Sequence, residues 1–127
     1  MLIHLIDSYL PGIFSTKLPS LSLIAKTKSF LIQVNTGREK QKSGVNPEDV
    51  DDFFDFCKKK LKIPISGLMC IPPISDKPAI HFSNLNKLSK KLNLRHLSMG
   101  MSSDYEEAIK FGSTYIRIGE SFFGKRI

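Results

Sequence analysis

Two segments near the C-terminal end decide the fold: LSMGMSSD at residues 97–104 and TYIRIGESFFG at residues 114–124. Each is a short apolar run that breaks at glycine or serine and then continues with helix-forming residues. The pattern predicts a strand, a tight loop and a helix N-terminus, twice in succession. Helix N-termini bind anions because their first N–H groups are unpaired and lie at the positive end of the helix dipole. The predicted phosphate site, formed mostly by main-chain N–H groups, comprises Ser102, Ser103, Gly119 and Glu120.

The rest of the chain repeats this alternation of strand and helix. Strands are predicted at 30–35, 63–71, 95–99 and 114–118, after a weaker one at 1–6, with helices between the last four. Such alternation implies parallel strands joined by crossover helices. Because a closed eight-stranded barrel needs about 200 residues or more, the sequence predicts an α/β fold that is a partial (β/α) TIM-type barrel, about its last five strands. We expect one incomplete domain over residues 1–127, irregular over 1–29 and built of regular βα units over 30–127.

The helices have recognisable ends and inward faces. Asn46 is predicted to cap a helix that has Pro47 at its first position, and Ser103-x-x-Glu106 is predicted to form a capping box. A second helix is expected from about Pro78 to Leu92. The apolar residues that recur at helical spacing are Val50, Phe53, Phe54, Cys57 and Leu61 in the first helix and Phe82, Leu85, Leu88 and Leu92 in the second.

Other reactive side chains are interpreted as structural. Cys57 and Cys70 lie among apolar residues without metal-ligand spacing, which predicts buried thiols and no disulfide or zinc site. Three aspartates, Asp51, Asp52 and Asp55, are expected on a solvated helix face. His81 is expected at the surface or at the boundary of the core.

Composition limits the classes of partner. The 127 residues include 19 Lys and Arg against 12 Asp and Glu, a net charge of +7. We expect no nucleic-acid partner, because the lysines are spread along the chain and no recognised binding motif accompanies them. The sequence has no apolar run of membrane-spanning length and no basic region before its first apolar residues, so the expected location is cytoplasmic, with no membrane partner.

These motifs resemble one known family. LSMGMSSD, followed by an alanine-isoleucine, glycine-serine and R-I-G-x-x-x-F-G run, resembles the C-terminal signature of the pyridoxal-phosphate homeostasis proteins (YggS/PROSC-like), which are relatives of the alanine racemase barrel. The resemblance continues upstream in GLMCIP at 67–72 and in LIQVN at 31–35 with KSG at 42–44, and more faintly in IHLIDS at 3–8. The four motifs stand in the right order and cover most of the chain from about Phe30 onward.

The resemblance implies a pyridoxal 5'-phosphate site and roles for its residues. Ser102 would contact the phosphate through its hydroxyl, and Gly119 and Glu120 through their main-chain N–H groups. Met101 would line the ring pocket. Arg117 would face the pyridine nitrogen, and because arginine only donates hydrogen bonds and stays charged, it would keep that nitrogen unprotonated. This suits a carrier or a restrained racemase and argues against a transaminase. The weaker candidates at the same end of the barrel are Ser98, Asn35 and Lys42.

The family's Schiff-base lysine is the largest departure, because it lies upstream of the matching motifs. Lys26 imitates its motif but stands directly before the 30–35 strand, and is interpreted as a linker lysine. The expected function is therefore pyridoxal-phosphate binding in cofactor homeostasis, truncated, with weak or non-covalent binding and no catalysis. The alternatives are a fragment of a pyridoxal-phosphate-dependent amino-acid racemase, a fragment of another phosphate-ligand barrel, which would need His81 or His96 as a base, and an RNA-binding module.

An incomplete parallel sheet also predicts partners. Unpaired strand edges promote association, and parallel strands normally have both faces covered. We expect either self-association or completion by a separate N-terminal half.

Overall fold

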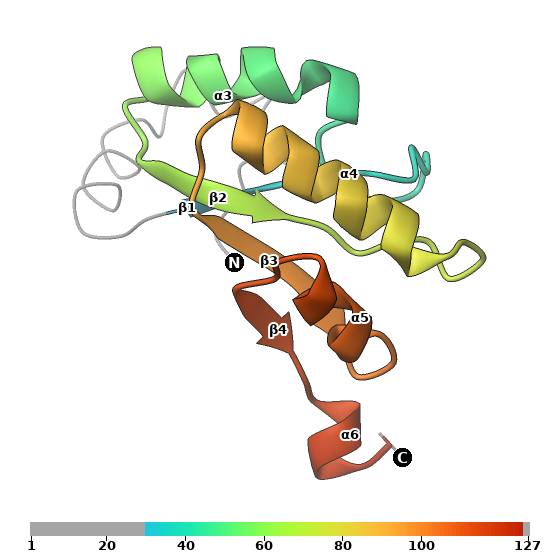
Figure 1. Cartoon of the computed structure of the whole chain (residues 1–127). Coiled ribbons are helices and arrows are strands. Elements are labelled where there is room, and N and C mark those ends of the chain that lie inside the picture. The colour runs from blue at the N-terminus through green and yellow to red at the C-terminus, as the bar shows by residue number, and fades with distance from the viewer. Residues whose placement is uncertain (1–29, 126–127) are drawn as a thin grey trace.

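The computed structural model describes residues 30–125, and these form a parallel sheet with helices (Figure 1). Its strands are β1 (Phe30–Gln33), β2 (Ile65–Met69), β3 (His96–Met101) and β4 (Tyr115–Arg117), in the order β1-β2-β3-β4. Every pairing is parallel, as the alternation predicted. The predicted strand at 1–6 and Lys26 lie outside the described residues.

Helices follow each strand. A 3-10 turn, η1 (Pro47–Asp49), leads into α3 (Val50–Lys59), and α4 (Pro78–Lys91) follows β2. Figure 1 shows α3 and α4 together on one face of the sheet. After β3 comes α5 (Tyr105–Lys110), and after β4 comes α6 (Glu120–Phe123), which stands away from the body. The structure is thus a partial α/β barrel. None of the described helices is long and apolar enough to cross a bilayer.

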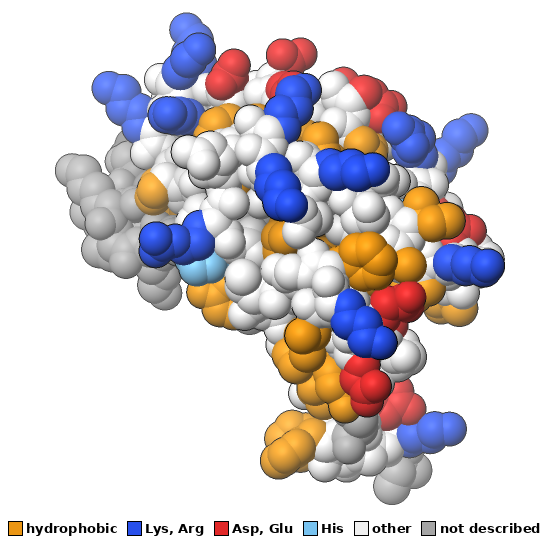
Figure 2. Space-filling view, viewed as in Figure 1, with side chains coloured by type: hydrophobic (Ala, Val, Ile, Leu, Met, Phe, Trp, Pro, Cys, Tyr) orange, Lys and Arg blue, Asp and Glu red, His pale blue; other side chains and the backbone are white. Residues whose placement is uncertain are grey.

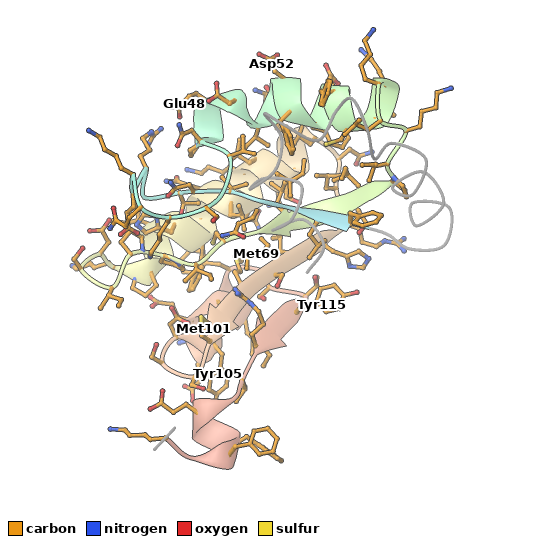
Figure 3. The ribbon with its side chains drawn as sticks, turned by 180° about the vertical axis from the view of Figure 1, so that it is seen from behind. Glu48, Asp52, Met69, Met101, Tyr105 and Tyr115 are labelled. Atoms are coloured by element: carbon orange, nitrogen blue, oxygen red, sulfur yellow. The ribbon has the colours of Figure 1, made fainter. Side chains whose placement is uncertain are left out.

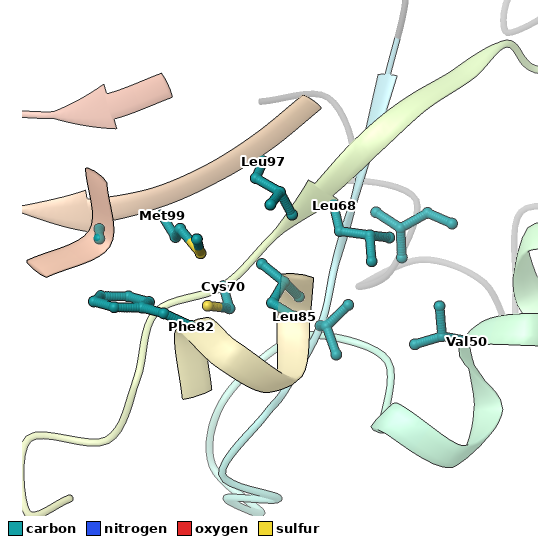
Figure 4. Packing of buried hydrophobic residues seen from close by; sticks show 10 residues of the cluster. Val50, Leu68, Cys70, Phe82, Leu85, Leu97 and Met99 are labelled. Carbon is teal, nitrogen blue, oxygen red and sulfur yellow. The ribbon is translucent and has the colours of Figure 1, made fainter. Parts of the chain in front are cut away.

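The core lies between the sheet and the two long helices (Figure 4). Phe82 and Leu85 of α4 are fully buried against the strands, and Val50 of α3 joins them. The strand residues in this cluster are Ile32, Val34, Leu68, Cys70, Leu97 and Met99. The apolar stripes predicted for both helices are therefore the faces that the core covers.

Both cysteines are buried and unpaired, as expected. Burial raises the pKa of the Cys57 thiol to about 12 and that of the Cys70 thiol to about 12, because a thiolate is poorly solvated among apolar side chains. At neutral pH they are small apolar groups and not nucleophiles.

Three local predictions were wrong. His81 is 5% exposed, and its Nε2 lies 3.0 Å from the Asp76 carboxylate, so this histidine belongs to the interior. Asn46 does precede Pro47 at the start of η1, but its side chain makes no capping hydrogen bond. The Ser103–Glu106 capping box is also absent from the described structure, since α5 begins at Tyr105 after Asp104.

Candidate functional site

The loop after β3 is shaped by a bulge. Ser98 pairs with Tyr115 and Met101 with Arg117, so three steps along β3 oppose two along β4. Gly100 lies inside the bulge with φ +100°, a backbone conformation that glycine adopts without strain. The bulge brings Met101 level with Arg117 at the carboxyl ends of their strands.

Ser113 and Thr114 hold β4 beside β3. The Ser113 hydroxyl lies 2.6 Å from the main-chain oxygen of Met99, and the Thr114 N–H donates to the Leu97 oxygen at 2.8 Å. In return, Leu97 N–H donates to the Thr114 hydroxyl at 2.8 Å. These contacts fix the register of a strand that is only three residues long.

Arg117 is the half-buried cation of this region. Its Nη2 donates to the main-chain oxygen of Cys70 at 2.9 Å, which ties the last strand to the end of β2. Its buried Nε has no hydrogen-bond partner within residues 30–125. Desolvation lowers the pKa of Arg117, an effect that Cys70 and Asp104 oppose, yet a guanidinium starts so high that it stays charged.

Asp104 organises the loop between β3 and α5. Its Oδ1 accepts a hydrogen bond from the Met101 main-chain N–H at 2.7 Å. Figure 3, from behind, shows Met101 at the end of β3, with Tyr105 close by on the side of α6. The carboxylate thus fixes the turn that carries Ser102 and Ser103.

A groove separates these loops from α6. It has a volume of about 1210 Å³ and is open on one side. Ligand pockets are typically about 300–1,000 Å³ and well enclosed, so the described residues form one wall of a site and do not surround a ligand. The lining residues are Met101, Ser102, Ser103, Arg117, Gly119, Glu120, Phe123, Gly124 and Lys125.

The structure brings together most of the predicted cofactor-binding residues. Met101, Ser102, Arg117, Gly119 and Glu120 all line this groove. Ser98 does not, because it is 6% exposed within β3, where it pairs with Met69 and Tyr115. The sequence interpretation missed Phe123, Gly124 and Lys125, which follow the recognised motif and carry no signal of their own.

The weaker candidates Asn35 and Lys42 line a separate hollow of about 270 Å³ beyond β1. Both side chains are engaged within the loop itself. The Asn35 amide exchanges two hydrogen bonds with the Glu39 main chain, at 2.8 and 3.1 Å, and the Lys42 ammonium lies 2.7 Å from the Glu39 carboxylate. They stabilise the loop after β1.

The residues needed for the alternative chemistries lie elsewhere. Neither His81 nor His96 lines the groove; the His96 ring packs against Tyr115, with ring centroids 5.3 Å apart. A phosphate-ligand enzyme would therefore lack a histidine base among the described groove residues. The described residues also contain no cluster of side chains that could hold a metal ion.

Comparison with known proteins matches this arrangement. Residues 17–126 fit the family model of the alanine racemase N-terminal domain. A pyridoxal phosphate homeostasis protein of Aquifex aeolicus is 41% identical over 105 residues, which cover 76% of this chain and 46% of the relative. The protein of the same name from Pseudomonas aeruginosa is 43% identical over 100 residues, covering 75% and 44%.

Solved structures agree with the fold. PipY of Synechococcus elongatus, determined without pyridoxal phosphate, is similar with a TM-score of 0.73 and 28% identity over 84% of this chain and 56% of PipY. The structure of PipY with pyridoxal phosphate bound gives a TM-score of 0.64 at 27% identity, covering 84% and 55%. The chain thus spans about half the length of the curated relatives it matches.

Proposed function

Because the chain belongs to the alanine racemase N-terminal domain family, and its curated relatives are pyridoxal phosphate homeostasis proteins, we propose that it binds pyridoxal 5'-phosphate without covalent attachment and without turnover. The observation that supports this proposal is the groove itself. Five of the six residues expected from sequence to bind the cofactor line it, although they come from two different strand–loop units.

The phosphate end of the ligand would lie at the two loops. Ser102 offers a hydroxyl, and Gly119 and Glu120 offer main-chain N–H groups. An added Cβ at Gly119 would meet no described atom within 4 Å, so the backbone there is open to a ligand. Both Gly119 and Glu120 are exposed, and a phosphate would repel the Glu120 carboxylate, so only its main chain is useful for binding.

The ring end would lie between Met101 and Arg117. Met101 is 41% exposed and supplies apolar surface at the edge of the groove. Arg117 has a half-buried guanidinium with an unpartnered Nε among the described residues, which fits an acceptor such as a pyridine nitrogen. The cofactor acts as an electron sink when its ring nitrogen is protonated, and an arginine partner, which only donates, restrains that chemistry.

Weak binding is expected because the groove is open and the family's anchoring lysine has no counterpart here. Lys125 is the only lysine of residues 30–125 that lines the groove. It lies at the opposite side from the strand ends, on the α6 segment. If a lysine did attach to the aldehyde, Lys125 would be its first candidate, ahead of Lys42 and Lys26.

The proposal is tested by titrating the purified protein with pyridoxal phosphate, reducing with borohydride and mapping labelled lysines by mass spectrometry. We expect saturable binding that inorganic phosphate competes away, with scattered labelling or none. One lysine labelled stoichiometrically at low ligand concentration would overturn the non-covalent assignment. Absence of any saturable binding would overturn the function.

Two variants and a control assign the binding to the groove. Arg117→Leu should weaken binding about tenfold or more, since a hydrogen bond to a charged group contributes about 1.5–3 kcal/mol. Gly119→Ala should weaken binding while the fold is unchanged, because its Cβ would enter the space offered to the phosphate. Arg95→Leu removes an exposed arginine outside the groove and should bind as the unaltered protein does.

A further inference from the structure

The last strand and helix carry a group of exposed apolar side chains. Tyr115 is 51% exposed, Ile116 39%, Phe122 79% and Phe123 83%. We call these four residues the β4–α6 patch. Figure 2 shows hydrophobic side chains gathered in the part of the molecule where β4 and α6 lie, while lysines and arginines cover the body. Contiguous exposed apolar surface of this kind marks an interaction site.

The helix α6 has little support within the described chain. It is four residues long, and its two phenylalanine rings pack against each other, with centroids 4.9 Å apart. Isolated helices much longer than this are marginal in water. Its persistence as a helix therefore implies a surface that covers the phenylalanines.

The backbone beside it is equally unpartnered. β4 is the last strand of the described sheet, and it pairs only with β3. An edge strand presents a row of unpaired N–H and C=O groups, and natural proteins protect such edges with charges, prolines or bulges. Tyr115 and Ile116 carry none of these protections.

We propose that the β4–α6 patch docks onto the same patch of a second copy of this chain, with the two β4 strands antiparallel across a two-fold axis. Isologous pairing of this kind is the commonest arrangement of homodimers. The two four-stranded sheets would then join into one, and Phe122 and Phe123 of each copy would cover those of the other. The inference is independent of cofactor binding, although Phe123 borders the groove.

Charge favours a second copy over an acidic partner. Residues 101–125 contain three lysines or arginines and four acidic residues, in a chain whose net charge is +7. The basic excess therefore lies elsewhere, and an acidic partner would bind there instead. Two copies meet with least repulsion at this end of the molecule.

Exposure favours self-pairing over closure of a barrel. Closure would place β4 of one copy against β1 of the other. Phe30 and Ile32 of β1 are 3% and 0% exposed, so β1 offers no matching apolar side chains there. The outer edge of β1 also pairs with Val45, which accepts from Asn35 and donates to Gln33. The patch is small, so the dimer should be weak, with a dissociation constant of roughly micromolar order.

Cross-linking tests the proposed axis directly. Ile116 is the central residue of β4, so two Ile116→Cys side chains would face each other near the axis within disulfide reach. The native thiols do not interfere, because both are buried. The matched control is Ile80→Cys, an isoleucine 57% exposed on α4, outside the patch.

We expect mild oxidation of the cofactor-free protein to give a covalent dimer of Ile116→Cys and not of Ile80→Cys. In sedimentation, the unaltered chain should shift with concentration from 14.3 kDa towards twice that mass. Phe122→Ser with Phe123→Ser should weaken this about tenfold or more, whereas Ile74→Ser with Ile80→Ser should not. Circular dichroism shows that each variant is folded.

Three outcomes would overturn the proposal. One is a chain that stays monomeric at hundreds of micromolar, and another is equal cross-linking of both cysteine variants. The third is a dimer that survives loss of both phenylalanines, or one in which Ile116→Cys does not cross-link, as closure through β1 would give. None of these measurements uses pyridoxal phosphate, so their failure leaves the proposed cofactor binding untouched.

Discussion

Arg117 and Cys70 are joined by a hydrogen bond that reaches past a whole strand. The Arg117 Nη2 donates to the Cys70 main-chain oxygen at 2.9 Å, so the side chain of β4 crosses the end of β3 to satisfy the end of β2. The candidate cofactor residue is therefore also a structural tie. Its position does not depend on a ligand, because this one bond already orients the guanidinium towards the strand ends.

Replacing Arg117 should cost stability as well as binding. Arg117→Ala removes a charged donor and leaves a carbonyl oxygen unpaired, which should lower the free energy of unfolding by about 1–3 kcal/mol. Arg95→Ala, at an exposed position, should change it by less than about 0.5 kcal/mol. Urea unfolding followed by circular dichroism measures both. Equal midpoints for the two variants would contradict the tie.

The two glycines of the site should respond differently to alanine. An added Cβ at Gly100 would lie 2.7 Å from the Ala108 Cβ and 3.0 Å from the Tyr105 Cα, at a φ of +100°. Gly100→Ala should therefore destabilise the protein by about 1–3 kcal/mol. Gly119→Ala meets open space at a φ of −126° and should unfold like the unaltered protein. A well-tolerated Gly100→Ala would show that the bulge is not rigid.

Long-range order was readable from sequence because periodicity and punctuation report it. Pro78 and the apolar repeat predicted α4 almost to the residue, and the four described strands fall inside or beside the predicted apolar runs. The groove was largely predictable too, since carboxyl ends of neighbouring parallel strands lie together, and the two motifs both stand at such ends.

What failed depends on single side-chain choices that no period reveals. The place of Ser98 could not be foreseen, because the bulge between Ser98 and Met101 changes which side chains reach the groove. His81 is buried because Asp76, in the loop before α4, provides a partner. The predicted box at Ser103 gave way to Asp104, whose shorter reach to the Met101 N–H closes the turn first.

The contact between His81 and Asp76 should be needed for a stable β2–α4 connection. Asp76→Ala leaves a buried imidazole nitrogen without its acceptor, and should lower the free energy of unfolding by about 1–2 kcal/mol. Asp76→Asn keeps an acceptor oxygen and should recover part of the loss. Asp52→Ala, an exposed aspartate on α3, is the control and should be nearly neutral in thermal unfolding. A neutral Asp76→Ala would mean that His81 finds another partner.

Alkaline pH should destabilise the protein through its two thiols. Their pKa is about 12 in the folded chain and near the ordinary 9.0 when unfolded. Above pH 9 the unfolded state therefore binds fewer protons than the folded one, and stability falls as pH rises towards 12. Below pH 9 both states hold the proton, and the thiols add no pH dependence.

Urea unfolding of the unaltered chain and of Cys57→Ala with Cys70→Ala, at pH 7, 8.5, 9.5 and 10.5, isolates this effect. The double variant starts from a lower stability because it has cavities, but its stability should fall less steeply above pH 9. Lysines and tyrosines titrate equally in both proteins, so the difference in slope reports the cysteines. Parallel slopes, or rapid alkylation of the native protein by iodoacetamide at pH 8, would mean that the thiols reach solvent without unfolding.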